Sequence, residues 1–296
     1  MALGLDLTGQ VALVTGGGAG IGRGVALSLA AAGADVVLAE IDADRAEQTA
    51  ELVRRTGRAA LPVPTDVMDT EQVRAAVAAA DHRFGRLDVL VNNAGGVSGR
   101  RFAEQSERSW RRHIDINLVS ALAATSAAVP LIVRGGRGGS IVNVSSIEAT
   151  RAAPMFAVYA ACKAALNSFT RTMAVELAEH GIRVNAIGPD QTITPGNHGQ
   201  RSGPVDESAF LVREPDDQAA LERYVPLGRE GSVEECGSLV AFLCSPLASY
   251  VTGAVVPVDG GAWAASGWVR NAEGGGWALG AFPVTREEGP AGAPGR

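Results

Sequence analysis

The sequence is poor in cysteine and has no long apolar run. Three of its 296 residues are cysteines, namely Cys162, Cys236 and Cys244. Because the number is odd and the spacing fits no metal site, we expect reduced thiols in a cytoplasmic protein rather than a disulfide framework. No stretch reaches the roughly 18 consecutive apolar residues of a membrane span. Residues 1–10 also lack the basic and apolar segments of a signal peptide.

Basic residues do not outnumber acidic ones. The chain has 26 lysines and arginines against 32 aspartates and glutamates, which gives a net charge of −6. We therefore expect it to bind neither nucleic acid nor an anionic membrane. The four histidines are dispersed, and none pairs with acidic residues at metal-ligand spacing, so we also expect no metal.

Short apolar runs alternate with amphipathic segments as far as about residue 260. We expect strands at Val11–Thr15, Asp35–Glu40, Ala59–Thr65, Leu87–Asn92, Ser140–Ser145, Arg183–Ile187 and Ala254–Val258. We expect helices at Ile21–Ala32, Asp44–Thr56, Thr70–Phe84, Ser106–Arg134, Ala157–His180 and Val233–Ser245. Strands that are apolar on both faces and separated by helices imply a parallel sheet covered on both sides. The predicted fold is therefore α/β, a single doubly wound Rossmann-type domain with a seven-stranded parallel sheet.

A glycine-rich turn, Thr15-Gly-Gly-Gly-Ala-Gly-Ile-Gly22, links the first expected strand to the first expected helix. Gly16, Gly20 and Gly22 have no side chain, so the chain can turn tightly and a pyrophosphate can approach the backbone. The helix that follows can then direct its free N–H groups at that anion. Taken alone, the pattern fits an ordinary tight turn equally well. A P-loop is excluded because no Gly-Lys-Ser or Gly-Lys-Thr follows.

Glu40, at the end of the second expected strand, indicates which dinucleotide the turn would hold. A carboxylate there can accept hydrogen bonds from the adenosine ribose, and it would repel the 2′-phosphate of NADP. Ala19 offers that phosphate no basic partner. These residues favour NAD. The alternatives are a solvated Glu40 and a methyltransferase, which also has a glycine loop before an acidic strand end but no Tyr–Lys pair downstream.

Tyr159 and Lys163 are four residues apart, so they share one face of a predicted helix. An ammonium group beside a phenol, together with the positive nicotinamide of an oxidised cofactor, favours the phenolate and lowers a pKa that is ordinarily about 10. Such a tyrosine can act as a base at neutral pH. A surface pair without a catalytic role is the alternative. Ser145-Ser146 and Asn92-Asn93-Ala94-Gly95 end two expected strands at the same sheet edge, and Asn117 interrupts an apolar helix.

With these residues the chain resembles the short-chain dehydrogenase/reductase family, in its single-domain subgroup of about 250 residues. The resemblance extends from about residue 6 to residue 261. The matching positions are Thr15–Gly22, Asp66, Asn92–Gly95, Asn117, Ser145–Ser146, Tyr159, Lys163 and Pro189. The resemblance implies an NAD-dependent oxidoreductase that transfers hydride between nicotinamide C4 and the carbon of a secondary alcohol or ketone.

The resemblance also implies a role for each site residue. Tyr159 would exchange a proton with the substrate oxygen, which Ser146 would hold, while Ser145 would be structural. Lys163 would bind the nicotinamide ribose and lower the Tyr159 pKa, and Asn117 would hold a water that links Lys163 to solvent. The implied cofactor-binding residues are Gly16, Gly20, Ile21, Gly22, Glu40, Asp66, Val67, Asn93, Ala94, Gly95, Tyr159, Lys163, Pro189, Thr192 and Thr194.

Four residues depart from the family pattern or are unusual near the implied site. Cys162 replaces the usual serine before the lysine, a change that we expect to be silent. Asp190 stands where the family has a glycine after Pro189, and Thr192 stands where it usually has valine or isoleucine. Glu148 either contacts a polar substrate or is a solvated loop residue.

We place the dinucleotide-binding and catalytic domain at residues 1–261 and a Trp/Gly-rich C-terminal extension at residues 262–296. Residues 190–225 form a polar insertion that we interpret as a substrate lid rather than a surface excursion. The extension carries three tryptophans, Trp263, Trp268 and Trp277. We expect them to pack against a partner subunit or the mouth of the active site, and we expect the chain to be loose beyond residue 286.

Two other functions remain open at this point. One is an NADPH-dependent ketone reductase similar to the 3-oxoacyl carrier-protein reductases of the same family. The other is a non-catalytic dinucleotide sensor. The resemblance further implies a homotetramer that packs through the helices expected at Ser106–Arg134 and Ala157–His180. The only other partner we expect is a small-molecule alcohol or ketone substrate.

Overall fold

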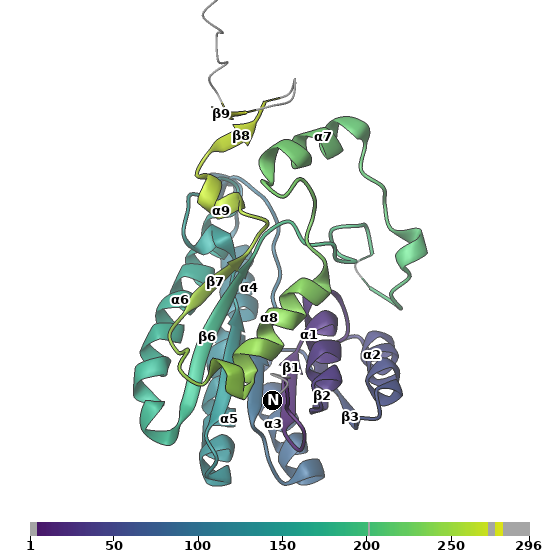
Figure 1. Cartoon of the computed structure of the whole chain (residues 1–296), viewed down its shortest axis with the longest axis vertical. Coiled ribbons are helices and arrows are strands. Elements are labelled where there is room, and N and C mark those ends of the chain that lie inside the picture. The colour runs from purple at the N-terminus through teal and green to yellow at the C-terminus, as the bar shows by residue number, and fades with distance from the viewer. Residues whose placement is uncertain (1–4, 201, 272–275, 281–296) are drawn as a thin grey trace, which may run out of the picture. The chain divides into compact units, whose positions relative to one another are not determined.

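The strands at the centre of the sheet are apolar on both faces, and this determines the architecture. Strands of this kind need helices on both sides, which parallel crossovers provide. The strands are β1 (Val11–Thr15), β2 (Asp35–Glu40), β3 (Ala60–Pro64), β4 (Val89–Asn92), β5 (Gly139–Val144), β6 (Ile182–Pro189) and β7 (Val255–Val258). They form one sheet in the order β3-β2-β1-β4-β5-β6-β7, and every neighbouring pair is parallel (Figure 1). The predicted doubly wound fold is confirmed.

The computed structural model describes residues 5–200, 202–271 and 276–280. It divides into two compact units. The larger unit comprises Met1–Val212 with Gly231–Asp259, and the smaller comprises Arg213–Glu230 with Gly260–Arg296. The expectation of a loose chain beyond residue 286 lies outside the described residues.

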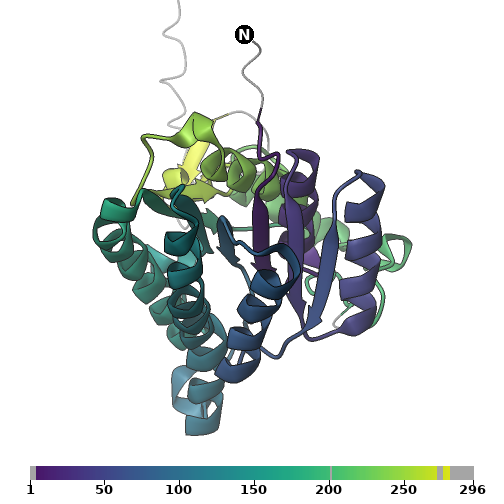
Figure 2. The same cartoon turned by 90° about the horizontal axis from the view of Figure 1, so that it is seen from below.

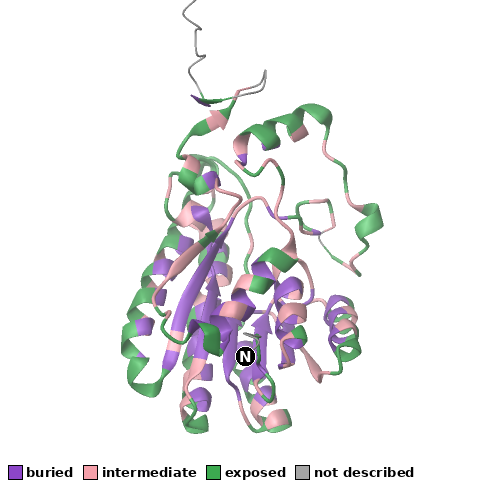
Figure 3. Ribbon diagram, in the orientation of Figure 1, coloured by how far each residue is buried: buried purple, intermediate pink, exposed green. Residues whose placement is uncertain are grey.

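Helices cover both faces of the sheet in the larger unit (Figure 2). They are α1 (Gly20–Ala31), α2 (Ala43–Arg55), α3 (Thr70–Phe84), α4 (Glu107–Ile114), α5 (Ser120–Gly135), α6 (Ala157–Glu176) and α8 (Val233–Cys244). Short 3-10 turns occupy Phe102–Glu104, Ile147–Ala149, Ala178–His180, Glu207–Ala209 and Pro246–Ala248. Residues of α1, α2 and α8 form one core cluster with the sheet, and residues of α3, α5 and α6 form another. The buried residues are concentrated on the strands between these layers (Figure 3).

The helix expected at Ser106–Arg134 is interrupted. Between α4 and α5 the chain makes a π-helical segment, Asp115–Val119. Asn117, in this segment, donates its side-chain Nδ2 to the carbonyl oxygen of His113 at 3.0 Å. That oxygen is four residues back, so the side chain competes with the regular i→i−4 ladder. The apolar periodicity does not reveal such a break.

The helical segment from Glu107 to Gly135 is long and apolar enough to cross a membrane, judged by length and composition alone. Its α5 portion buries Ala124, Ala128, Leu131 and Ile132 in the second core cluster. That burial is the ordinary pattern of a helix that packs on a sheet.

The smaller unit contains elements that we did not expect from the sequence. They are α7 (Pro215–Tyr224), α9 (Ala262–Ala265) and an antiparallel pair of strands, β8 (Trp268–Arg270) and β9 (Trp277–Leu279). The three tryptophans of this unit are between 43% and 48% exposed. The Arg270 guanidinium carbon lies 5.3 Å from the ring centroid of Trp277.

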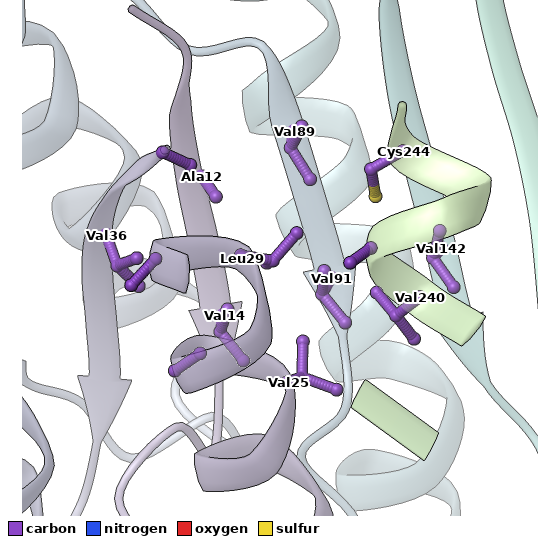
Figure 4. Close-up of a cluster of buried hydrophobic side chains, with 14 of the residues drawn as sticks. Ala12, Val14, Val25, Leu29, Val36, Val89, Val91, Val142, Val240 and Cys244 are labelled. Carbon is purple, nitrogen blue, oxygen red and sulfur yellow. The ribbon is translucent and has the colours of Figure 1, made fainter. Parts of the chain in front are cut away.

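We predict that replacing Leu29 with alanine lowers the free energy of unfolding by about 2–5 kcal/mol, because Leu29 of α1 is fully buried. Its side chain lies among Ala12, Val89 and Val91 of the sheet (Figure 4). Urea denaturation measures the loss. Leu247→Ala is the control, since Leu247 is 39% exposed and should cost less than half as much. Equal losses in the two variants would contradict this account of the core.

Candidate active site

The end of β1 is joined to the end of β4 by a threonine and an asparagine. The Thr15 hydroxyl oxygen accepts the backbone N–H groups of Asn93 at 3.0 Å and Ala94 at 3.1 Å. The side-chain Nδ2 of Asn93 donates to the carbonyl oxygens of Thr15 at 2.9 Å and Gly16 at 3.1 Å. The glycine loop is therefore fixed to the neighbouring strand end. The role of Thr15 was not predicted, although it begins the glycine motif.

The glycine loop is too crowded for side chains at the predicted positions. A Cβ at Gly22 would lie 2.0 Å from the Gly16 carbonyl oxygen. Gly16 and Gly20 both have positive φ angles, +63° and +52°. No side chain caps the first turn of α1, which contains Ile21, so its N–H groups remain available to an anion. These features fit the phosphates of a dinucleotide.

Glu40 lies buried at the carboxyl end of β2, with 8% of its surface exposed. One oxygen, Oε2, accepts the backbone N–H of Gly18 at 3.0 Å. The other, Oε1, accepts those of Ile41 at 2.9 Å and Asp42 at 3.1 Å. The carboxylate thus holds the glycine loop through backbone N–H groups, and its ribose role stays a prediction.

Asp66 and Val67 follow the end of β3. The Asp66 carboxylate accepts the N–H of Met68 at 3.0 Å, and its own N–H donates to Gln72 Oε1 at 2.9 Å. Val67 is buried, with 8% of its surface exposed. These contacts fix the loop where the predicted adenine contacts lie.

A chain of buried amides and hydroxyls supports the centre of the edge. Asn92 Nδ2 donates to Asn143 Oδ1 at 2.8 Å and to Thr125 Oγ1 at 3.1 Å. Asn143 Nδ2 donates to Thr170 Oγ1 at 2.8 Å. The network ties β4 and β5 to α5 and α6, so it fixes α6 relative to the strand ends.

Ser146 and Tyr159 are brought together at this edge. The Ser146 oxygen accepts the backbone N–H of Glu148 at 3.1 Å. Its own proton is therefore free to be donated, and the Ser146 hydroxyl lies close enough to the Tyr159 phenol for hydrogen bonding to favour a lower pKa of that phenol. The Ser145 hydroxyl donates instead to the backbone carbonyl oxygen of Lys163 at 3.2 Å.

Lys163 is the only lysine in the chain. Its side chain is buried, and Nζ donates to the Val144 carbonyl oxygen at 2.8 Å. The same ammonium lies 5.7 Å from the ring centroid of Tyr159. Burial lowers the pKa of Lys163 from 10.5 to about 8, because removal from water disfavours its charged form.

The pKa of Tyr159 is raised, not lowered, by the groups of the chain itself. Burial of the phenol is the largest cause. The hydrogen bond from Ser146 opposes it, and the negative charges of Glu148 and Asp190 add to it. The lowering that we expected from Lys163 is not among the causes of this shift, and the Lys163 ammonium donates to the Val144 carbonyl oxygen rather than to the phenol.

The Asn117 side chain is hydrogen-bonded to the loop after β4. Its Nδ2 donates to the Gly96 carbonyl oxygen at 2.8 Å, and its Oδ1 accepts the Gly96 N–H at 3.1 Å. A Cβ on Gly95 would lie 2.9 Å from Asn117 Oδ1 and 3.5 Å from Lys163 Nζ. Asn117, Gly95 and Lys163 are therefore neighbours.

The segment after β6 approaches the glycine loop. Pro189 ends β6, and Thr192, with 3% of its surface exposed, donates to the Asp190 carbonyl oxygen at 2.9 Å. The side chain of Thr194 lies 3.4 Å from where a Cβ on Gly20 would be. The predicted nicotinamide-end residues thus lie beside the predicted phosphate turn.

Arg151 is a residue near the site that the sequence analysis missed. Its guanidinium forms ion pairs with Glu148 at 2.6 Å and Asp190 at 3.9 Å. The spacing of three residues between Glu148 and Arg151 was the available signal. The two unusual carboxylates near Tyr159 are therefore joined by one cation.

Cys162 is buried on α6, and its thiol contacts the His113 carbonyl oxygen at 3.7 Å. Burial raises the pKa of this thiol, and the nearby Lys163 charge opposes the rise. A raised pKa leaves little thiolate, so the residue is a poor nucleophile. Among the described residues, no group of three or more His, Cys, Asp or Glu side chains is placed to hold a metal ion.

Comparisons with known proteins agree with this geometry. A family model described as enoyl-(acyl carrier protein) reductase matches residues 16–262. The chain is 37% identical to 3beta-hydroxysteroid dehydrogenase 1 of Eggerthella lenta, over 86% of this chain and 94% of that one. It is 36% identical to galactitol 2-dehydrogenase of Agrobacterium fabrum, over 88% and 99%. It is also 36% identical to the 3-oxoacyl-[acyl-carrier-protein] reductase of Thermotoga maritima, over 87% and 99%.

A solved structure with the same fold holds a nicotinamide cofactor. It is carveol dehydrogenase from Mycobacterium avium in complex with NAD. The TM-score is 0.79 at 33% identity, and the match covers 87% of this chain and 98% of that one.

We predict that the stability of the protein rises by about 1–2 kcal/mol between about pH 8 and about pH 9.5, relative to a Lys163→Met variant. In this range the unfolded chain still binds the lysine proton, whereas the folded chain, with a pKa of about 8, has lost it. Urea denaturation at each pH measures the difference. The single lysine resonance in protein labelled at lysine Cε reports the pKa directly, and a midpoint near 10.5 would contradict the prediction.

Proposed function

The chain belongs to the short-chain dehydrogenase/reductase family, and we propose that it is an NAD-dependent oxidoreductase acting on a secondary alcohol or its ketone. The observation that carries the proposal is that the Ser146 hydroxyl and the Tyr159 phenol come together at the sheet edge. Tyr159 lies on α6, which also carries the buried Lys163, and Ser146 follows β5 at the edge that also carries the glycine loop. A non-catalytic dinucleotide sensor would not need this set of residues.

The proposed chemistry follows from the hydrogen bonds of these side chains. Because Ser146 accepts the Glu148 N–H, it can donate its own proton to the substrate oxygen and hold it. Tyr159 removes the proton of that oxygen during alcohol oxidation and returns it during ketone reduction. When bound, an oxidised nicotinamide supplies the hydride acceptor and a positive charge that favours the phenolate. Lys163 would orient the nicotinamide ribose, and Asn117 would connect Lys163 to solvent.

We propose NAD rather than NADP as the cofactor. Glu40 places a negative charge at the end of β2, and Ala19 provides no cation. The carveol dehydrogenase complex with NAD supports the same choice. The alternative is an NADPH-dependent ketone reductase, which the similarity to the Thermotoga maritima reductase supports.

The substrate is proposed to enter under the segment after β6. We keep residues 190–225 as the substrate lid of a catalytic domain that spans residues 1–261. Leu211 and Val212, in the part of this segment that belongs to the larger unit, are 67% and 92% exposed. Exposed apolar side chains of this kind suit a surface that closes on a ligand. We also propose a homotetramer, and a cytoplasmic location, which suits three buried free thiols.

Replacing Tyr159 with phenylalanine should lower turnover by about 10²–10⁴-fold, because the proton acceptor is lost. The reaction is followed by the absorbance of reduced cofactor, in a screen of secondary alcohols with NAD. NAD affinity, measured by calorimetry, should stay unchanged. Tyr250→Phe is the control, since Tyr250 is fully exposed. A Tyr159→Phe enzyme with most of its activity would refute the proposed mechanism.

Replacing Glu40 with glutamine should raise the affinity for NADP relative to NAD by about tenfold, because a charge that repels the 2′-phosphate is removed. Glutamine keeps one acceptor oxygen for the Gly18 N–H, but its amide nitrogen then faces the N–H groups of Ile41 and Asp42, so NAD binding by the variant is measured first to show that the loop persists. The two dissociation constants are compared with those of Glu47→Gln, which changes an exposed carboxylate of α2. If the ratio does not move, the choice of cofactor is made by other residues.

A further inference from the structure

The segment after β6 is bound by one face of α2. Asp42, Arg45 and Gln48 follow one another at intervals of three residues, so they lie on the same side of the helix. Asp42 Oδ2 accepts the backbone N–H of Gly203 at 2.8 Å. Arg45 Nε donates to the Gly203 carbonyl oxygen at 2.7 Å. Both backbone groups of Gly203 are therefore paired with side chains of α2.

Two further residues of the segment are held by the same face. The amide group of Gln48 donates to the Val205 carbonyl oxygen and accepts the Val205 N–H, each at 3.0 Å. A second nitrogen of Arg45 donates to the Gln200 carbonyl oxygen at 3.1 Å. We call Gln200 together with residues 202–206 the strap; it lies against the start of α2 (Figure 1).

The same helix face also holds the glycine loop. Thr49 Oγ1 donates to the Gly18 carbonyl oxygen at 3.0 Å. A Cβ on Gly18 would lie 2.7 Å from Glu40 Cγ and 2.9 Å from Arg45 Cβ. Arg45 is therefore next to both the glycine loop and Glu40, and its guanidinium reaches from there to the strap.

The strap keeps the Arg45 guanidinium occupied. Arg45 is 9% exposed, and its donors are directed at the carbonyl oxygens of Gln200 and Gly203. An arginine near the end of the second strand is what accommodates the 2′-phosphate of NADP in dinucleotide-binding folds. For Arg45 to pair with that phosphate in bidentate fashion through Nε and Nη2, its bonds to the strap would have to break.

We propose that the strap is a second determinant of cofactor choice, which withholds Arg45 from a 2′-phosphate and thereby favours a dinucleotide with a free 2′-hydroxyl. The proposal rests on the proposed function, because it assumes that a dinucleotide lies on the glycine loop. It assigns to Asp42, Arg45 and Gln48 a positioning role that is separate from the charge of Glu40.

The test alters the strap and leaves α2 intact. Gly203→Pro removes the N–H that Asp42 accepts, and proline cannot adopt the φ of +75° found at Gly203. The expected result is an affinity for NADP that rises about tenfold, while that for NAD changes less than about threefold. Adding Arg45→Ala should abolish the gain. Gly57→Pro is the control, because Gly57 also has a positive φ, +82°, but lies after the far end of α2.

Hydrogen exchange of the Val205 amide shows whether the strap has been released. Gln48→Ala is a second variant, which should free this amide without any change in the strap sequence. Loss of Val205 protection without a gain in NADP affinity would overturn the proposal, and so would a gain that persists in Gly203→Pro/Arg45→Ala. Neither the hydrogen exchange nor the affinity measurement depends on turnover. A wild-type protein that fails to bind NAD would instead refute the proposed function together with the strap.

Discussion

Parallel pairing on both sides of β1 is the constraint on which the candidate site depends. β1 pairs with β2 on one side and with β4 on the other, and all three strands point the same way. The glycine loop therefore leaves β1 between the carboxylate that ends β2 and the asparagine that follows β4. A shift of one residue in either ladder would turn each side chain to the other face. Thr15 would then lose the N–H groups of Asn93 and Ala94, to which its hydroxyl is bonded.

The proposed chemistry at this sheet edge uses two buried ionisable side chains, Lys163 and Tyr159, whose charged forms are costly to bury. All basic side chains of the protein except Lys163 and the histidines are arginines, which stay protonated at any ordinary pH. Lys163 is thus the one amine whose charge burial can weaken near neutral pH. Burial moves Lys163 and Tyr159 in opposite directions, lowering the first pKa and raising the second, and in both cases it favours the neutral form. A bound positive charge near the phenol would reverse that preference for Tyr159.

The sequence predicts the features that repeat and misses those that arise from a single contact. β1 and β2 have the predicted bounds, because burial on both faces gives their interior residues a continuous apolar signal. The break at Asn117 comes from one side-chain bond to the His113 carbonyl, which the apolar period cannot reveal. The strap escapes prediction for a related reason. Its bonds join Arg45 to Gly203, 158 positions apart in the chain, and most of them involve backbone groups that every residue has.

The proposed roles of the strap and of residues 190–225 make cofactor selection and substrate selection dependent on one segment. One segment leaves β6 at Pro189, passes Gly20 at Thr194 and reaches α2 at Gly203. Under our proposals, changes in its length or composition would act at both ends of the bound dinucleotide. Glu40 and the strap would act on the same 2′ position by different means, since one would repel a phosphate and the other would occupy the cation that attracts it. If this segment changes to accept a new substrate, the protein would keep the proposed cofactor preference only if the hydrogen bonds of Gly203 and Val205 with the side chains of Asp42, Arg45 and Gln48 remain.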